Sequence, residues 1–230
     1  MSNLNQEMPK AVQGVVFDMD GLLLETESLY RTAIFQAASE FGYDMTDALH
    51  LSLIGTPQDL CDALLRAALG DEFPLRAYDA RCHALFTKLT EHALKPKPGV
   101  FELLNWLADR QIPVAIATST RRATATENLA RVGLSTLAQR MVAGGEAPRG
   151  KPHPDPYLAA VKLLGLAPRD CVAFEDSHTG VRAASAAGLF TVMVPDLLPP
   201  TPEMHLITSA IVDDLRAGLQ LLEHGTAPAR

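Results

Sequence analysis

The apolar run from Ala11 to Phe17 is the stretch around which the rest of the chain is organised. It has the length and the Val and Phe content of a buried strand, without the alternation of a strand that has one exposed face. It ends in two carboxylates, Asp18 and Asp20, followed by Gly21. Carboxylates at the end of a buried strand are costly unless their charge is compensated, and hard oxygen ligands suit Mg²⁺. A simple turn at Asp20-Gly21 is the structural alternative.

Four helical patterns, with no strand between them, follow from about Ser28 to Leu94. Apolar residues recur at helical spacing in each pattern, and glycine, threonine and proline stand where helices end or begin. The predicted helices lie, in order, before Gly42, after Thr46, between Thr56 and Gly70, and after Pro74. We therefore expect a helical insert directly after the first strand.

Beyond Lys95–Gly99, which holds two prolines and a glycine, the pattern changes to alternating helices and strands. The predicted strands cover residues 114–117, 141–143, 171–174 and 191–194. The predicted helices cover residues 100–110, 122–132 and 155–164, a stretch ending at 187, and residues 212–223. The proline-rich stretch from Pro195 to Pro202 is interpreted as an exposed loop.

This alternation implies a parallel sheet with right-handed crossovers. The sequence therefore predicts an α/β fold with a Rossmann-like parallel sheet core and an inserted four-helix domain. We expect the core to comprise residues 1–27 and 95–230, and the insert to comprise residues 28–94.

Composition and charge narrow the possible partners. The 230 residues carry a net charge of −7, which disfavours nucleic acids and anionic membranes as partners. No apolar run approaches the ~18 residues of a membrane helix, and the polar stretch from Met1 to Lys10 lacks the apolar region of a signal peptide. The three cysteines form no metal-binding spacing. We expect a soluble, cytoplasmic protein that is a monomer or a weak dimer.

Polar side chains follow three predicted strands at their carboxyl ends. They are Asp18 and Asp20 after the first, Thr118 and Ser119 after the second, and Glu175 and Asp176 after the strand of residues 171–174. Lys151 stands between Gly150 and Pro152 on an intervening connection. Each group alone is explained by a helix cap or a solvated charge. Since parallel strand ends converge at one edge, where open α/β sheets bind ligands, their joint placement predicts a site.

These side chains suit phosphoryl transfer. Carboxylates from two strands can hold one Mg²⁺, and a further carboxylate can attack phosphorus to form an aspartyl-phosphate. The metal and Lys151 can neutralise the equatorial oxygens, which hydroxyls such as that of Thr118 and backbone N–H groups can bind. A second carboxylic acid can protonate the leaving oxygen and later activate water. Mg²⁺ and Lys151 would thus create a cationic site within an acidic protein.

The four motifs together resemble the haloacid dehalogenase superfamily, in its phosphatase branch with a helical cap. The family's Asp-x-Asp-Gly stands here as Asp18 to Gly21, and its strand-terminal Ser or Thr as Thr118. Its lysine stands as Lys151, and its acidic pair as Glu175-Asp176. All four occur in order, and the resemblance covers nearly the whole chain. It implies that the helical insert is a cap that closes over the site.

The resemblance also implies a role for each residue. Asp18 is the nucleophile and a Mg²⁺ ligand, and Lys151 neutralises the nucleophile and the phosphate. Asp20 is the general acid/base and coordinates the metal through its backbone carbonyl. The remaining metal site is completed by Asp176, which binds Mg²⁺ directly, and by Glu175, which supports it directly or through water.

Substrate contacts are expected from both parts of the chain. In the core, the resemblance implies that Thr118 binds the transferring phosphate, with Ser119 contributing chiefly its backbone. In the cap and hinge, Glu27, Tyr30 and Thr56 are the candidates for substrate selection. The resemblance implies a Mg²⁺-dependent phosphomonoester hydrolase acting on a small phosphorylated metabolite, a sugar phosphate or similar compound, through an aspartyl-phosphate.

Phosphosugar mutation, as in the β-phosphoglucomutases, is the principal alternative. Mutases of this branch carry a histidine early in the first cap helix and an arginine in the second cap segment. Here Tyr30 stands near the first position, and residues 54–59 hold no arginine. Phosphonatases use a cap lysine, yet no lysine occurs between Lys10 and Lys88, and dehalogenases generally lack the second aspartate, which is Asp20 here.

Two non-enzymatic classes are also open. A signalling receiver domain combines aspartates, Thr or Ser, lysine and Mg²⁺, but its phosphoacceptor ends a middle strand and it needs no insert. A non-catalytic phosphate-binding relative is expected to have lost Asp18 or Asp20, and both are present.

Overall fold

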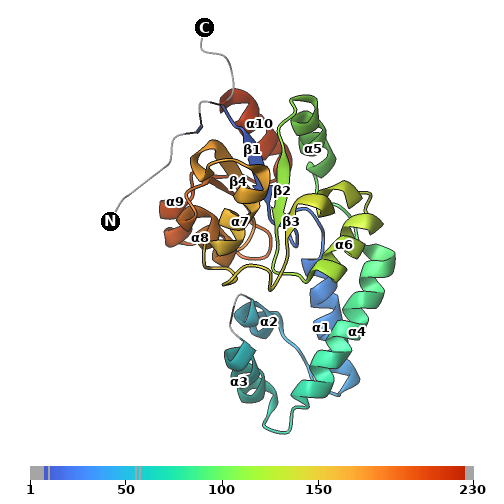
Figure 1. Cartoon of the computed structure of the whole chain (residues 1–230). Helices are drawn as coiled ribbons and strands as arrows, with labels where there is room; N and C mark the ends of the chain where they lie inside the picture. The colour runs from blue at the N-terminus through green and yellow to red at the C-terminus, as the bar shows by residue number, and fades with distance from the viewer. Residues whose placement is uncertain (1–7, 10, 55, 57, 226–230) are drawn as a thin grey trace. The chain divides into compact units, whose positions relative to one another are not determined.

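The computed structural model describes residues 8–9, 11–54, 56 and 58–225, the side chains of residues 58 and 59 excepted (Figure 1). The chain divides into two compact units. One unit comprises the residues up to Leu24 and those from Lys95 onward, and the other comprises Glu25–Leu94. The role of residues 28–94 as a cap domain stays a prediction.

The first unit is built on a six-stranded parallel sheet with strand order β3-β2-β1-β4-β5-β6. The strands are β1 (Gly14–Phe17), β2 (Val114–Ala117), β3 (Met141–Val142), β4 (Cys171–Glu175), β5 (Phe190–Met193) and β6 (Ala210–Ile211). The helices are α5 (Val100–Asp109), α6 (Arg122–Arg131), η1 (Ser135–Arg140), α7 (Asp155–Leu164), η2 (Pro168–Asp170), α8 (His178–Ala186), α9 (Pro202–Ile207) and α10 (Leu215–Gly225). The predicted α/β fold with a Rossmann-like parallel sheet is confirmed (Figure 1).

Both faces of the central strands are covered, as their apolar composition predicts. Every residue of β1 and of β4 is buried. Val16 and Ala173 belong to one apolar cluster, which includes Tyr157 from α7. The rings of Phe17 and Phe174 stack with their centroids 5.4 Å apart, and successive strand residues point to opposite faces. The two strands therefore give a rigid base to the residues that follow them.

The order of the strands explains where the carboxylates meet. The chain runs from β1 to β2 and β3, and then returns to the other side of β1 to form β4. In open α/β sheets such a reversal opens a crevice at the carboxyl ends of the strands. Phe17 is paired with Phe174, and the backbone N–H of Asp18 donates to the carbonyl of Phe174 at 3.0 Å. The register thus places Asp18 beside Glu175.

The second unit contains the four predicted helices. They are α1 (Glu27–Glu40), α2 (Asp47–Leu53), α3 (Gln58–Leu69) and α4 (Leu75–Ala93). Buried side chains of α1 and α4, among them Ala37, Tyr78 and Leu85, form one apolar cluster. Thr46 caps α2, because its hydroxyl accepts a hydrogen bond of 3.2 Å from the backbone N–H of Leu49. The predicted cap at Thr56 with Pro57 involves residue 57, which lies outside the described residues.

The segment after β5 differs from its prediction. The structure adds α9 and β6, which were not expected because elements of six and two residues are too short to show a periodicity. A start signal for α9 was present: the hydroxyl of Thr201 accepts from the N–H of Met204 at 3.3 Å, and Pro202 follows it. The stretch from Pro195 to Thr201 is a loop, as predicted, but most of its residues are half-buried rather than exposed, and Pro202 begins α9.

Two element boundaries also differ. The first strand begins at Gly14 rather than near Ala11. The last helix begins at Leu215 rather than near residue 212. Val212 instead continues the sheet, because its N–H donates to the carbonyl of Met193 at 2.9 Å. Asp214 then caps the helix by accepting from the N–H of Arg216 at 2.8 Å.

Candidate active site

The predicted polar groups of the core meet at the carboxyl edge of the sheet. Asp18 follows β1, Glu175 is the last residue of β4, and Thr118 follows β2 directly. These three strands are neighbours in the sheet. Asp18, Thr118 and Glu175 are 7%, 3% and 0% exposed, respectively, although all three are polar. Burying polar side chains costs free energy unless they are paired. The contacts among these three side chains therefore determine which chemistry the carboxyl edge of the sheet can support.

Lys151 lies between two carboxylates. Its ammonium group donates to Oδ1 of Asp18 and to Oε1 of Glu175. The Lys151 side chain is 5% exposed. Burial alone would lower the pKa of Lys151, but the charges of Asp18 and Glu175 outweigh burial and raise it. Lys151 is therefore held as a cation at neutral pH.

The pKa of Asp18 is raised by some of its neighbours and lowered by others. Burial raises the pKa of Asp18 above its ordinary value, and the charges of Glu175 and Asp20 add to that rise, whereas Lys151 lowers it. The carboxyl group of Asp18 thus depends on neighbouring cations to stay ionised. This dependence is a reason to expect a second positive charge beside Lys151.

All the oxygens of Glu175 are occupied by protein donors. Its Oε1 accepts from Lys151 and from the hydroxyl of Tyr157, the latter at 3.0 Å. Its Oε2 accepts from the N–H and from the hydroxyl of Ser177, at 2.9 and 3.0 Å. The Ser177 hydroxyl also caps α8, where it accepts from the N–H of Gly180 at 3.1 Å. Glu175 is therefore held rigidly and in turn holds Lys151 toward Asp18.

Gly180 is required by this arrangement. A Cβ at this position would lie 1.7 Å from Oε1 and 1.9 Å from the carboxyl carbon of Glu175. The absence of a side chain on α8 lets the helix approach the carboxylate closely. The contact of Tyr157 with Glu175 was not predicted, because these residues lie 18 positions apart on separate elements.

Asp20 is held by two hydroxyl groups. Oδ2 of Asp20 accepts from Thr120 at 2.7 Å and from Thr118 at 3.2 Å. The Thr118 hydroxyl in turn accepts from the N–H of Thr120 at 3.0 Å. Thr120 was missed by the sequence analysis, although it continues the polar run that begins at Thr118. The contacts place the Asp20 carboxyl on the side of β2, where it can exchange a proton with a bound molecule.

A hollow of about 340 Å³ opens beside these groups. Thr118, Ser119 and Lys151 line it, together with the backbone-rich segment around Gly144. Ser119 is exposed, as suits a residue that offers its backbone to a ligand. The hollow is large enough for a phosphate group, and its lining offers the ammonium group of Lys151 and the hydroxyls of Thr118 and Ser119.

Three carboxylates could hold a divalent cation. One oxygen each of Asp18, Glu175 and Asp176 lies within 4.8 Å of the others. Gly21, with φ of 80°, contributes to this space, since a Cβ there would lie 2.2 Å from Oδ2 of Asp176. Three carboxylates with one lysine leave a net negative charge and several hard oxygen donors, which fit Mg²⁺. Because both oxygens of Glu175 already have donors, Asp18 and Asp176 are the better placed direct ligands.

Glu27, Tyr30 and Thr56, the candidates for substrate selection, belong to the second unit. Glu27 is the first residue of α1, and the Thr56 hydroxyl donates to the carbonyl of Ser52 at 2.9 Å. Tyr30 packs edge-on against Phe86, with their ring centroids 5.4 Å apart. Their predicted part in substrate selection stays a prediction.

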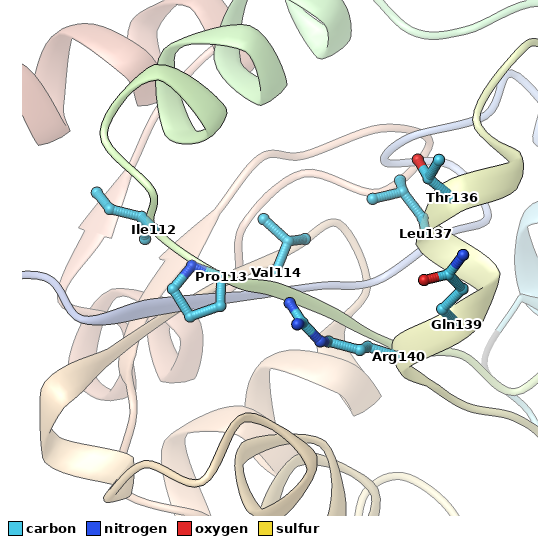
Figure 2. Close-up of a pocket in the computed structure, with 7 residues that line it drawn as sticks. All are labelled: Ile112, Pro113, Val114, Thr136, Leu137, Gln139 and Arg140. Atoms are coloured by element: carbon cyan, nitrogen blue, oxygen red, sulfur yellow. The ribbon is translucent and has the colours of Figure 1, made fainter.

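A second hollow, of about 270 Å³, lies at the other end of β2. Figure 2 shows Arg140 of η1 extending toward Pro113 and Val114, where β2 begins. This hollow lies at the opposite end of the strand from Thr118, so it is separate from the carboxyl-edge site.

Comparisons with known proteins agree with the geometry of the carboxyl edge. The family model for haloacid dehalogenase-like hydrolases matches residues 12–188. A phosphorylated carbohydrates phosphatase of Thermotoga maritima is 36% identical over 178 residues, which are 77% of this chain and 82% of that protein. The fructose-1-phosphate phosphatase YqaB of Escherichia coli is 31% identical over 182 residues, 79% of this chain and 95% of that protein.

A solved structure has a similar fold and a related sequence. The crystal structure of a candidate β-phosphoglucomutase from Thermotoga maritima superposes with a TM-score of 0.78 at 33% identity, and covers 92% of this chain and 99% of that one. Among the described residues, no helix is both long and apolar enough to cross a membrane. The matched family model, the relatives and the shared fold show that this chain belongs to the haloacid dehalogenase-like hydrolases.

Proposed function

We propose that the protein is a Mg²⁺-dependent phosphomonoester hydrolase that acts on a small phosphorylated metabolite, such as a sugar phosphate, through an aspartyl-phosphate on Asp18. The observation that carries the proposal is the buried carboxylate of Asp18, bonded to Lys151 and within 4.8 Å of the carboxylate oxygens of Glu175 and Asp176. The relatives named as phosphatases of phosphorylated carbohydrates and of fructose 1-phosphate support the substrate class.

In the first step, Asp18 forms a covalent bond to phosphorus. A carboxylate oxygen of Asp18 attacks phosphorus, and the bond between phosphorus and the ester oxygen breaks. Asp20 donates a proton to the departing oxygen, so that the product leaves as an alcohol. The hydroxyls of Thr118 and Thr120 orient Asp20 for this transfer, as their hydrogen bonds to its Oδ2 suggest.

The second step releases phosphate. Asp20, now ionised, accepts a proton from a water molecule whose oxygen attacks phosphorus, and Asp18 leaves as a carboxylate. Lys151 and the backbone at Ser119 balance the charge on the phosphoryl oxygens in both steps. Bound Mg²⁺, held by Asp18, the Asp20 carbonyl and Asp176, would supply further positive charge to the same oxygens. We propose that Glu175 acts through Lys151 or through a water.

A phosphosugar mutase is the second candidate, since one structural relative is described as a candidate β-phosphoglucomutase. It is less supported, because two sequence relatives are phosphatases and residues 54–59 hold no arginine for a second phosphate. A cytoplasmic location, a monomeric or weakly dimeric state, and the absence of nucleic-acid or membrane partners remain predictions from the sequence.

Phosphate release from a panel of monoesters tests the proposed function. The panel contains hexose 1- and 6-phosphates, fructose 1-phosphate, nucleoside monophosphates and an aryl phosphate, each with Mg²⁺ and with EDTA. We expect release that needs Mg²⁺ and is fastest for a few sugar phosphates. No release from any ester by the folded protein in Mg²⁺ contradicts a hydrolase, and interconversion of glucose 1- and 6-phosphates in the same mixtures would instead identify a mutase.

Replacing Gly180 with Ala is expected to lower both stability and turnover. The new Cβ would overlap the carboxylate of Glu175, which four hydrogen bonds hold in place. Overpacking of this kind costs about 1–3 kcal/mol, and displacing a group that supports a site costs about tenfold or more. Thermal unfolding and phosphate release measure the two effects.

Gly150→Ala is the control for Gly180→Ala, because nothing lies within 4 Å of its added Cβ. It should retain the wild-type melting temperature. If Gly180→Ala retains wild-type turnover, the position of Glu175 does not matter for catalysis.

A further inference from the structure

Lys97 and Asp196 form a half-buried ion pair in the core unit that the proposed mechanism does not use. The ammonium group of Lys97 donates to Oδ1 of Asp196 at 2.7 Å, and the two side chains are only 19% and 15% exposed. The N–H of Lys97 also donates to the carbonyl of Leu23 at 2.9 Å, which fixes its segment against the loop that follows β1. The pair thus links the segments after β1 and after β5.

The second oxygen of Asp196 is buried and accepts no hydrogen bond from the described residues. A buried carboxylate oxygen that lacks a donor is costly, so the rest of the structure must favour its position. A pair that served stability alone would be expected to satisfy both oxygens. The unpaired Oδ2 indicates that its partner lies outside the described part of the polypeptide, as a bound water would.

Oδ2 of Asp196 lies next to the candidate metal site. A Cβ built on Gly21 would lie 3.2 Å from this oxygen and 2.2 Å from Oδ2 of Asp176. The two carboxylate oxygens therefore both lie against the open side of Gly21. Asp196 does not belong to the group of Asp18, Glu175 and Asp176 whose oxygens lie within 4.8 Å of one another. It is close to the site without being in reach as a direct ligand.

We infer that Asp196, oriented by Lys97, is a positioning residue for the magnesium site: its Oδ2 accepts a hydrogen bond from a water of the bound ion. The inference rests on the proposed function. Mg²⁺ dehydrates reluctantly and keeps several waters in protein sites, so acceptors outside the direct ligands are needed. Lys97 limits the charge that Asp196 adds and fixes the direction of its free oxygen. Loss of such an outer acceptor weakens metal binding by about 10–100-fold.

Calorimetric titration of Mg²⁺ into the metal-free full chain tests the inference on Asp196→Asn. The amide oxygen of the asparagine can still accept from Lys97. The negatively charged oxygen that would accept from the metal-bound water is replaced by a neutral NH₂ group. We expect the dissociation constant for Mg²⁺ to rise by about tenfold or more. Asp213→Asn is the matched control, since Asp213 is an exposed aspartate just after β6 at the same edge of the sheet. It should stay within about twofold of wild type, because exposed charges are screened.

A second variant separates position from charge. Asp196→Glu keeps the charge and moves the carboxylate by one methylene, so a positioning role predicts weaker Mg²⁺ binding, by about fivefold or more. Wild-type affinity in Asp196→Asn or Asp196→Glu overturns the inference, as does equal weakening in Asp213→Asn. Unfolding of Asp196→Asn in EDTA assigns the residue to stability and also overturns it. Failure of the wild-type chain to bind Mg²⁺ would instead refute the proposed function.

Discussion

Asp18→Asn is expected to lower phosphate release by at least ~10⁴-fold while the protein stays folded. A carboxamide is not a nucleophile toward phosphorus, and its oxygen can still accept the hydrogen bond from Lys151. Lys151 also keeps Glu175 as its counter-ion, so no buried cation is left unpaired. Steady-state phosphate release and thermal unfolding in EDTA check both parts of the expectation.

The control for Asp18→Asn is Asp109→Asn. Asp109 is an exposed aspartate at the end of α5, before the start of β2, whereas Thr118 follows the other end of that strand. It should retain wild-type turnover and stability, because surface substitutions of this kind change little. Near-wild-type turnover in Asp18→Asn contradicts the assignment of the nucleophile, and loss of the folded state in EDTA would make the activity result uninformative about chemistry.

Lys151→Met is expected to lower kcat by about 10³-fold. The variant removes the cation that faces both the nucleophile and the phosphate. Since Lys151 lowers the pKa of Asp18, its loss raises that pKa further. The nucleophile must be ionised to attack phosphorus. The residual activity of Lys151→Met should therefore increase with rising pH more steeply than the activity of the wild type. A pH series of kcat on one sugar phosphate measures both effects.

Lys162→Met is the matched control for Lys151→Met. Lys162 is an exposed lysine on α7, whereas Lys151 is almost fully buried. It should leave kcat within about twofold of wild type. A loss of only twofold in Lys151→Met would show that this lysine does not act on the phosphoryl group, even though it contacts Asp18.

The sequence predicts the carboxyl edge of the sheet well because its signal is local. Each central strand is an uninterrupted apolar run, and the polar residue that ends the run is the residue that reaches the edge. The boundaries of β2 were predicted correctly from four residues, Val114–Ala117. Since β1, β2 and β4 are neighbours, the proximity of Asp18, Thr118 and Glu175 can be predicted without knowing their side-chain contacts.

The sequence does not reveal groups whose partners are distant along the chain. Tyr157 is an aromatic residue on an amphipathic helix, which predicts only a place in the core, yet its hydroxyl donates to Glu175. Lys97 and Asp196 stand 99 positions apart. Asp196 did carry a local signal, since it follows the apolar run of β5 as Asp18 follows β1, but the prolines around it favoured an exposed loop.

Trapping of the covalent intermediate tests the central claim most directly. The wild-type enzyme is mixed with a sugar phosphate and Mg²⁺, quenched within the first turnovers and reduced with borohydride, which converts an aspartyl-phosphate into homoserine. Peptide mass spectrometry then locates the change. We predict homoserine at position 18, absent without substrate and absent in Asp18→Asn. Phosphate release with no reduced product at position 18, or with one at another carboxylate, would contradict the claim that Asp18 is the nucleophile.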